Sequence, residues 1–172
     1  MNSLHVGWDG QVLLDRVRSD DKLGDPGFGP VLAASAPGRL DVMGGIADDG
    51  GALVLQSATD RCVVVACQGR NDQHVLIRQY VDDEVLEYRL PLSSFYSGHG
   101  TFAETAEFGV LFDRHGGAWA KPVAGVLLML LHGGYLPHLA GGATIVFESG
   151  LDPQAGLGRS EERRVGKECR SR

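Results

Sequence analysis

The stretch Ala36–Gly51 constrains the fold of this chain more than any other. It lies between the apolar runs Val31–Ala34 and Ala52–Leu55 and interrupts them with glycines, one arginine and three aspartates. We interpret it as a strand that carries an anion-handling arginine, followed by a turn that presents carboxylates to a polar ligand. The alternative is a charged, glycine-rich hairpin with no ligand, because Gly-Gly and Asp-Gly pairs are ordinary turn signals.

Length and composition indicate a globular domain. The chain has 172 residues, 43% of them hydrophobic, and 25 glycines, which is enough to bury a core in one domain. No apolar run reaches the roughly 18 residues of a membrane span, and Met1–His5 does not resemble the start of a signal peptide. Cys62 and Cys67 lie an odd number of residues apart in a strand-like run, so we expect them on opposite faces, neither bridged nor holding a metal. These features predict a cytoplasmic, reduced protein.

The charge is unevenly distributed along the chain. The total is −6, but residues 159–172 carry six basic and three acidic side chains, so residues 1–158 carry −9. An acidic body argues against binding of nucleic acid. The histidines show no metal-ligand spacing, and we predict no metal site built from protein side chains alone.

The pattern of apolar residues predicts an α+β domain. Residues 1–30 read as an N-terminal extension at the domain edge, with one or two helical turns in Gln11–Val17. The expected strands begin with two short ones on either side of a Pro-Gly turn and continue with three that form an antiparallel meander. They are Val31–Ala34, Leu40–Met43, Cys62–Cys67 (buried on both faces), His74–Val81 and Glu84–Leu90.

Helices and a last strand follow the meander. Phe102–Phe112 is expected to be helical, with Glu104 and Glu107 on one side. Lys121–His132 is the clearest helix, and because its interior is apolar nearly all round we expect it to be buried against the sheet. Ala143–Glu148 is the final strand. Strands followed by helices and a strand favour an α+β fold.

The first stretch also resembles a known family. Pro37-Gly38-Arg39, then Gly44, Asp48 and Gly51, resemble the first motif of the GHMP small-molecule kinases, which in galactokinases reads Pro-Gly-Arg-Val-Asn-Leu-Ile-Gly-Glu-His-Thr-Asp-Tyr-Asn-Gly-Gly. The wording from Ala36 to Asp48 is still more similar to the galactokinase-like domain of L-arabinokinases. The resemblance implies the N-terminal part of a GHMP kinase, residues 31–158, with a fold like domain 2 of ribosomal protein S5.

A second motif begins and is cut short. Leu151–Gly158 resembles the start of the family's phosphate loop, in which Gly156, Leu157 and Gly158 would contact the nucleotide through backbone N–H groups. The expected Ser-Ser-Ala is replaced by residues 159–172, which resemble a translated sequencing-library adapter. We therefore treat 159–172 as a non-native tail. The alternative is a basic tail that binds an acidic partner.

The resemblance implies an ATP-dependent sugar kinase that uses Mg²⁺ and phosphorylates an anomeric hydroxyl. It assigns Arg39 to the transferred phosphate and Asp48 to the sugar hydroxyls, whereas a salt bridge from Arg39 to Asp41 or Asp48 that staples the hairpin is the alternative. Gly45 and Ile46 replace the Glu-His that contacts the sugar in galactokinases, which favours L-arabinose over galactose. Asp49 replaces an aromatic residue, for which we have no account.

Two other functions remain open at this stage. One is a non-catalytic galactokinase-like regulator that binds sugar or nucleotide. The other is an S5-like RNA-binding domain, against which the acidic body argues. As written, the chain lacks the family's catalytic aspartate and third motif, so we expect the fragment to be inactive, with apolar surface exposed at its broken C-terminal edge.

Overall fold

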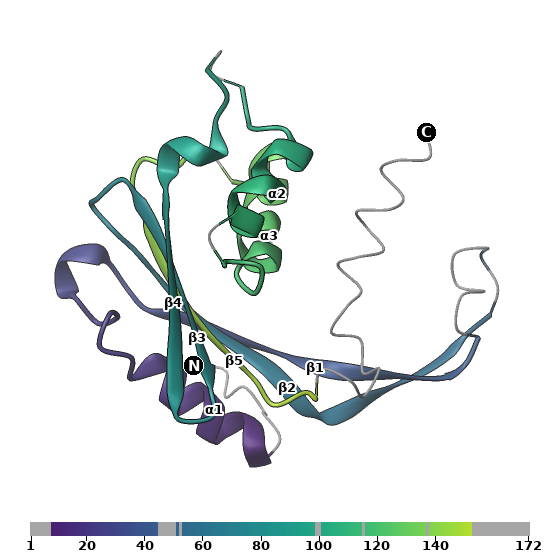
Figure 1. Cartoon of the computed structure of the whole chain (residues 1–172). Coiled ribbons are helices and arrows are strands. Elements are labelled where there is room, and N and C mark those ends of the chain that lie inside the picture. Colours follow the sequence, from purple (N-terminus) through teal and green to yellow (C-terminus); the bar gives the residue numbers. More distant parts are fainter. Residues whose placement is uncertain are drawn as a thin grey trace.

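A five-stranded sheet with the strand order β1-β2-β5-β3-β4 forms the centre of the fold (Figure 1). This computed structural model describes residues 8–44, 51, 53–98, 101–114, 116–136 and 138–152. The strands are β1 (Leu32–Met43), β2 (Leu55–Gly69), β3 (His74–Val81), β4 (Glu84–Pro91) and β5 (Ala143–Ser149). The helices are α1 (Trp8–Arg18), α2 (Thr105–Arg114) and α3 (Lys121–His132), with 3₁₀ turns at Pro26–Phe28 and Leu92–Phe95. The α+β prediction is confirmed.

The strand order corrects the expected three-stranded meander. β3 and β4 form the predicted antiparallel hairpin, but β2 and β3 do not pair, because β5 lies between them, antiparallel to β2 and parallel to β3. β5 is largely buried on both faces, and a central position gives both of its edges a hydrogen-bonding partner. The connection between β2 and β3 instead bonds to the residue before β5: the Arg70 N–H donates to the Gly142 carbonyl and the Gly142 N–H donates to the Asp72 carbonyl.

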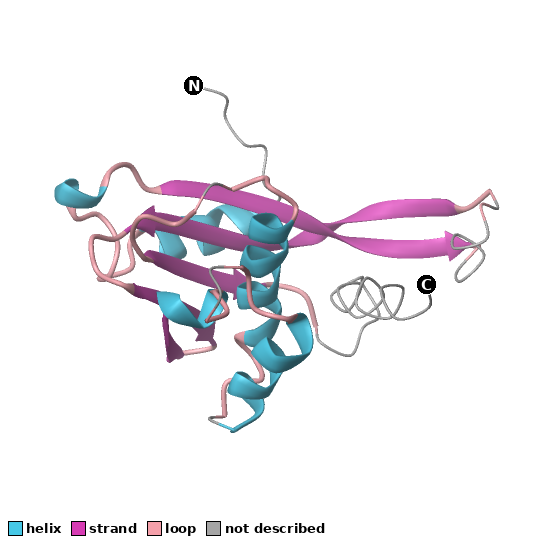
Figure 2. Cartoon of the chain, turned by 90° about the horizontal axis from the view of Figure 1, so that it is seen from above, coloured by secondary structure: helices cyan, strands magenta, loops and turns pink. Residues whose placement is uncertain are grey.

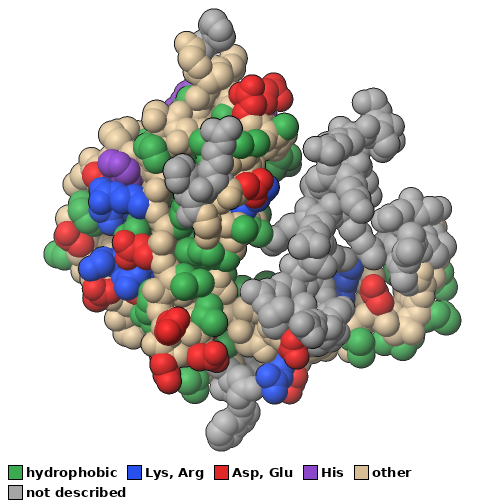
Figure 3. Space-filling model, viewed as in Figure 1, with side chains coloured by type: hydrophobic (Ala, Val, Ile, Leu, Met, Phe, Trp, Pro, Cys, Tyr) green, Lys and Arg blue, Asp and Glu red, His purple; other side chains and the backbone are tan. Residues whose placement is uncertain are grey.

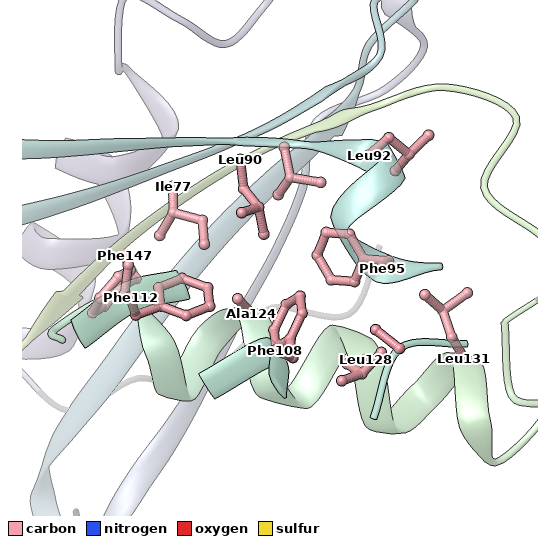
Figure 4. Close-up of a cluster of buried hydrophobic side chains, with 13 residues drawn as sticks. Ile77, Leu90, Leu92, Phe95, Phe108, Phe112, Ala124, Leu128, Leu131 and Phe147 are labelled. Atoms are coloured by element: carbon pink, nitrogen blue, oxygen red, sulfur yellow. The ribbon is translucent and has the colours of Figure 1, made fainter. Parts of the chain in front are cut away.

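One face of the sheet is covered by α2 and α3. Figure 4 shows the core between these two helices and the sheet. In this core, Phe108 and Phe112 of α2 and Leu128 of α3 point toward Ile77 and Leu90 of the sheet. All five side chains are nearly or completely inaccessible to solvent. α3 has the predicted bounds, with Pro122 in its first turn and Gly133 as its C-cap. α2 begins at Thr105, three residues later than expected, so Glu104 precedes the helix.

The opposite face of the sheet is covered by α1. Its Leu14 and Val17 pack on three buried strand residues, Cys62, Val64 and Val146. The helix is longer than the one or two turns we predicted, and it lies on a face of the sheet rather than at the domain edge (Figure 1). α1 lies on this face because a strand that is buried on both faces needs an apolar layer on each side.

The alternation of β2 explains its two cysteines. Residues 62, 64, 66 and 68 are buried toward α1, whereas residues 63, 65 and 67 are only partly buried on the other face. The strand is therefore less fully buried than predicted. Cys62 and Cys67 lie on opposite faces as expected, and no disulfide joins them. Partial burial raises the pKa of the Cys67 thiol.

The outer face of α3 is a second correction. We expected burial nearly all round, but Val126, Met129 and Leu130 are exposed (48%, 43% and 37%). Ala124, Leu128 and Leu131 of α3 are fully buried in the core, and Val123 and Leu127 pack against it partly buried. An apolar helix face is buried only where another element packs against it. Among the described residues, no element covers the side of α3 that carries Val126, Met129 and Leu130. No helix in the described ranges is long and apolar enough to cross a membrane.

Candidate functional site

The predicted arginine lies on a two-stranded ribbon that extends beyond the sheet. β5 pairs with residues 63–69 of β2, so residues 55–62 of β2 pair with β1 alone. We call residues 37–43 of β1 together with residues 55–62 of β2 the ribbon. Figure 2 shows these two strands reaching well past the helices. The ribbon ends in the loop that joins β1 to β2.

The strand passes through the Pro-Gly pair without a turn, which corrects the expected break between two short strands. Pro37 pairs with Cys62 and Arg39 with Ala58, so one residue of β1 lies opposite three of β2 at this irregularity. Because proline lacks an N–H donor, it is tolerated mainly on edge strands. β1 is an edge strand of this sheet. Irregularities of this kind redirect side chains and are frequent beside active sites.

Arg39 and Asp41 lie on one face of the ribbon. They stand two residues apart on β1, opposite Ala58 and Gln56 of β2. The Arg39 Nε atom is 3.9 Å from the Asp41 Oδ1 atom, and each side chain is about one third exposed (32% and 35%). A long contact between partly exposed groups contributes at most about 1 kcal/mol. The guanidinium presents forked N–H donors, which suit the recognition of phosphate oxygens.

This contact bears on the alternative in which Arg39 staples the hairpin. Arg39 and Asp41 belong to the same strand, so their ion pair does not itself tie β1 to β2. The other suggested partner, Asp48, lies outside the described residues. The assignment of Arg39 to a transferred phosphate stays a prediction.

The other face of the ribbon is apolar. Leu40, Met43 and Leu55 are exposed (47%, 61% and 54%), and the register places them together, with Met43 opposite Leu55. Figure 3 shows hydrophobic side chains at the far end of the ribbon. The ribbon is therefore two-sided, with the arginine and the aspartate on one side and a row of aliphatic side chains on the other.

The described ends of the two predicted motifs meet at one residue of β2. Pro37, which opens the first motif, pairs with Cys62 on one edge of β2. On the other edge, the Gly150 N–H donates to the Cys62 carbonyl at 2.9 Å, and Leu151 opens the second motif directly afterwards. Arg61 reinforces this junction, because its Nη1 atom donates to the Gly150 carbonyl at 3.5 Å.

The remaining predicted site residues fall outside the described ranges. These are the sugar-contacting candidates Gly45, Ile46 and Asp48 and the nucleotide-binding candidates Gly156, Leu157 and Gly158. Among the described residues, no three His, Cys, Asp or Glu side chains are grouped so that they could hold a metal ion. Of the predicted site, the described residues therefore include Arg39 and the junction at Cys62. The other assigned contacts stay predictions.

Two charged networks that sequence reasoning missed lie on the body of the domain. Arg78 of β3 donates to the buried carboxylate of Asp20 at 2.6 Å and also contacts Asp21, and the Tyr80 hydroxyl donates to the second Asp20 oxygen. Hydrogen bonds from Lys22 and then Arg78 lower the pKa of Asp21 to about 2. This network fixes the segment after α1 to the sheet. Its only sequence signal is an arginine inside an apolar strand.

The second network closes the end of the sheet away from the ribbon. The Arg70 guanidinium donates two hydrogen bonds to the Asp72 carboxylate, at 2.9 and 2.7 Å, and one to the Thr144 hydroxyl. Arg89 donates to Asp72 from β4 at 3.2 Å. The hydrogen bonds from Arg70 are the main reason that the pKa of Asp72 falls to about 2. In Figure 3, side chains of both charges gather over the β3–β4 side of the molecule.

Two solved kinase structures share this fold. Mevalonate kinase from Methanococcus jannaschii superposes with a TM-score of 0.54 over 76% of this chain, at 15% sequence identity. Galactokinase from Lactococcus lactis, solved in complex with galactose, gives a TM-score of 0.53 over 86% of the chain, at 18% identity. The chain therefore has the fold of the GHMP kinases, and the expected likeness to domain 2 of ribosomal protein S5 is consistent with this.

In sequence, the chain has weak homology to a particular sugar kinase. It is 32% identical over 125 residues to L-arabinokinase of Arabidopsis thaliana, a match that covers 59% of this chain. No protein-family model matches the chain. The chain spans 12% of the L-arabinokinase, 36% of the mevalonate kinase and 32% of the galactokinase. These matches therefore show a GHMP-kinase-like fold and weak sequence homology to one L-arabinokinase, over part of each relative.

Proposed function

We propose that this chain is an N-terminal part of an ATP-dependent cytoplasmic kinase that phosphorylates the anomeric hydroxyl of a monosaccharide. L-arabinose is the leading substrate and a galactose-like sugar is the next. The proposal combines the GHMP kinase fold with homology to an L-arabinokinase. The Gly45-Ile46 pair, where galactokinases have Glu-His, is the reason for preferring L-arabinose.

One observation carries the proposal. The strand that bears Arg39 and the segment that opens the predicted phosphate loop meet on the two edges of β2 at Cys62, through the Pro37 pairing and the Gly150 hydrogen bond. A phosphoryl-transfer site needs a cationic side chain and a backbone anion cradle close together, because catalysis rests on positioning and charge neutralisation. Two motifs that open 114 residues apart in the sequence, at Pro37 and Leu151, begin beside one residue of β2.

Each proposed residue has one physical task. Arg39 would donate to the oxygens of the transferred phosphate and offset the charge that develops there. Asp48 would accept hydrogen bonds from two sugar hydroxyls and so orient the ring. The backbone N–H groups of Gly156, Leu157 and Gly158 would receive the nucleotide phosphates.

Mg²⁺ is expected to accompany ATP in such a reaction, where it neutralises phosphate charge. The described residues do not form a metal site on their own, since they contain no suitable group of three ligands. We therefore derive no step through the ion and assign it no ligand in this chain.

The test is phosphorylation by the uninterrupted gene product, with a native sequence in place of residues 159–172. The protein is incubated with ATP, Mg²⁺ and a panel of L-arabinose, galactose and uronic acids, and the product is examined by ³¹P NMR and by a reducing-end assay. We expect L-arabinose to lose its reducing end as an anomeric phosphate forms. Phosphate on another hydroxyl, or no transfer to any sugar, would contradict the proposal, and sugar binding without transfer would favour a regulator.

The 172-residue chain itself is proposed to be inactive. Its resemblance to the GHMP kinase motifs ends at Gly158, before the rest of the phosphate loop and the family's catalytic aspartate. Sugar phosphorylation by the purified 172-residue chain at more than background rate would refute this statement, while the proposal for the uninterrupted protein would stand.

A further inference from the structure

Gln56 of β2 continues the polar face of the ribbon beyond Arg39. The register pairs Arg39 with Ala58 and Asp41 with Gln56, with no irregularity between the two pairs, so Arg39, Asp41 and Gln56 share one face. The next step along the ribbon is irregular and brings Met43 opposite Leu55, on the apolar face. Asp41 and Gln56 are therefore the last pair on the polar face of the described ribbon.

The Gln56 side chain is half-buried, and among the described residues no group hydrogen-bonds to its amide. Burial costs an amide hydrogen bonds to water, and most buried polar groups in proteins regain a partner. The amide can donate through its NH₂ group and accept at its oxygen, whereas the Asp41 carboxylate across from it accepts only. Together they suit a ligand that carries neighbouring hydroxyl groups.

The spacing of Gln56 from Arg39 fits a monosaccharide. The two residues are diagonal neighbours across the strands, which normally lie about 7–8 Å apart. Transfer to an anomeric hydroxyl requires that hydroxyl beside the phosphate on Arg39. In one direction from Arg39, the strands lead to the junction at Cys62, where the proposed nucleotide loop opens. The sugar ring therefore extends the other way, over Asp41 and Gln56.

We propose that Gln56, with Asp41 opposite it, binds ring hydroxyls of the sugar and determines the specificity of the proposed kinase. This inference rests on the proposed function. The Gln56 amide donates to one hydroxyl oxygen and accepts from the neighbouring hydroxyl, and the Asp41 carboxylate accepts from a hydroxyl as well. Gln56 lies outside both motifs. It is also the better residue to test, because Asp41 contacts Arg39.

The first experiment measures the Kd of L-arabinose in the uninterrupted protein by isothermal titration calorimetry. Gln56→Met keeps the length of the side chain and removes the amide, and Gln56→Leu removes the amide with a different shape. We expect both variants to raise Kd by about tenfold, since each loses the hydrogen bonds to the sugar. A rise in only one of the two variants, or in neither, would overturn the proposal.

Ser57 provides a matched control. It is the next residue of β2, pairs with Leu40 on the apolar side of the ribbon, and its hydroxyl donates to the Ala58 carbonyl at 3.3 Å. Ser57→Ala should leave Kd within about twofold of the parent, because its side chain faces away from the proposed site. A rise as large as that of Gln56→Met would mean that any change in the ribbon weakens binding, which contradicts a specific role for the amide.

A polar variant covers the case in which both apolar variants fail to fold. Gln56→Glu keeps the size of the side chain and its acceptor oxygens but removes the N–H donors. It should also raise Kd, and a parental Kd in this variant would contradict the proposed donation to the sugar.

The second experiment uses analogues of L-arabinose that each lack one non-anomeric hydroxyl. The parent should bind at least one analogue about tenfold more weakly than L-arabinose, because its polar group is then left without a partner. Gln56→Met should bind that analogue and L-arabinose about equally, since the group that recognises the hydroxyl is gone. If Gln56→Met discriminates among the analogues as the parent does, the amide does not contact the sugar.

Failure of the proposed function is distinguishable from failure of this inference. If the parent binds L-arabinose but transfers no phosphate, the proposed kinase activity fails, and the Kd values still decide whether Gln56 contacts the sugar. If the parent phosphorylates the sugar and the Gln56 variants bind it as the parent does, only the inference fails. A parent that binds none of the sugars contradicts both.

Discussion

The body of the domain and the ribbon share strands β1 and β2 but are stabilised differently. In the body, β2 is flanked by β1 and β5 and covered by α1 on one face, where Val64 and Ala66 have no exposed surface, and its other face is partly buried. In the ribbon, the same strand pairs with β1 alone, and Leu55 is 54% exposed. The described start of the first motif, residues 37–43, lies in the ribbon. Arg39 is therefore carried by a part of the molecule outside the core that determines the fold.

This separation predicts that matched substitutions have unequal effects in the two regions. In the first two comparisons, a body residue and a ribbon residue receive a comparable change, and two further predictions concern one region each. Stability is measured as the free energy of unfolding in urea, and any activity is measured in the uninterrupted protein.

The largest difference is expected from removal of a large apolar side chain. Phe112 has no exposed surface and stacks on Tyr88 at 5.1 Å between ring centroids. Phe112→Ala should destabilise the domain by about 4 kcal/mol, because it leaves a cavity in the core. Met43→Ala in the ribbon should cost less than about 0.5 kcal/mol. Similar costs at the two positions would show that the ribbon is packed as tightly as the body.

The second pair compares two arginines. Arg78→Met leaves the buried Asp20 carboxylate without its cation and should cost about 3 kcal/mol. Arg39→Met removes the long contact to Asp41, in which both side chains are partly exposed, and should cost less than about 1 kcal/mol. If Arg39→Met proved the more destabilising, the arginine would have a structural role, in agreement with the stapling alternative.

The third prediction concerns acid unfolding of the body. The folded-state pKa of Asp72 is about 2, below the ordinary 3.8, mainly because Arg70 donates hydrogen bonds to the carboxylate. The ionised form therefore stabilises the fold above about pH 4, and that contribution is lost as the pH falls from about 4 to about 2. Asp72→Asn should lower the unfolding temperature at pH 7 and flatten its decline between pH 4 and pH 2. An unchanged decline would exclude Asp72 as a source of acid sensitivity.

The smallest effect on stability is expected on the apolar face of the ribbon. Leu40→Thr and Leu55→Thr should change the free energy of unfolding by less than about 0.5 kcal/mol, since both side chains are about half exposed. They should reduce aggregation of the 172-residue chain in light scattering, because exposed aliphatic rows promote association. Stability losses above about 2 kcal/mol would mean that these side chains are packed within the monomer.

The same comparison explains how much could be predicted from the sequence. In the body, periodicity was enough for α3, β3 and β4, whose patterns are local. The position of β5 between β2 and β3 could not be predicted, because it depends on pairings between residues more than 60 positions apart, such as Ile77 with Ile145. We underestimated the length of α1, because its apolar side chains are explained only by the sheet face on which they pack.

In the ribbon, the motif was recognised but its geometry was not. Pro37-Gly38 looked like a turn, whereas an edge strand with an irregular register accommodates both residues. The roles of Arg39, Asp48 and the phosphate loop came from resemblance alone, and of these residues the structure describes only Arg39.

The most direct test of the account is the kcat of Arg39→Gln for anomeric phosphorylation of L-arabinose by the uninterrupted protein. We expect kcat to fall by about 100-fold or more, as for other groups that stabilise charge in the transition state. The unfolding temperature should stay within about 2 °C of the parent, because Arg39 lies in the partly exposed ribbon. A variant with parental kcat, or one whose activity falls only because it unfolds, would contradict the assignment of Arg39 to the transferred phosphate.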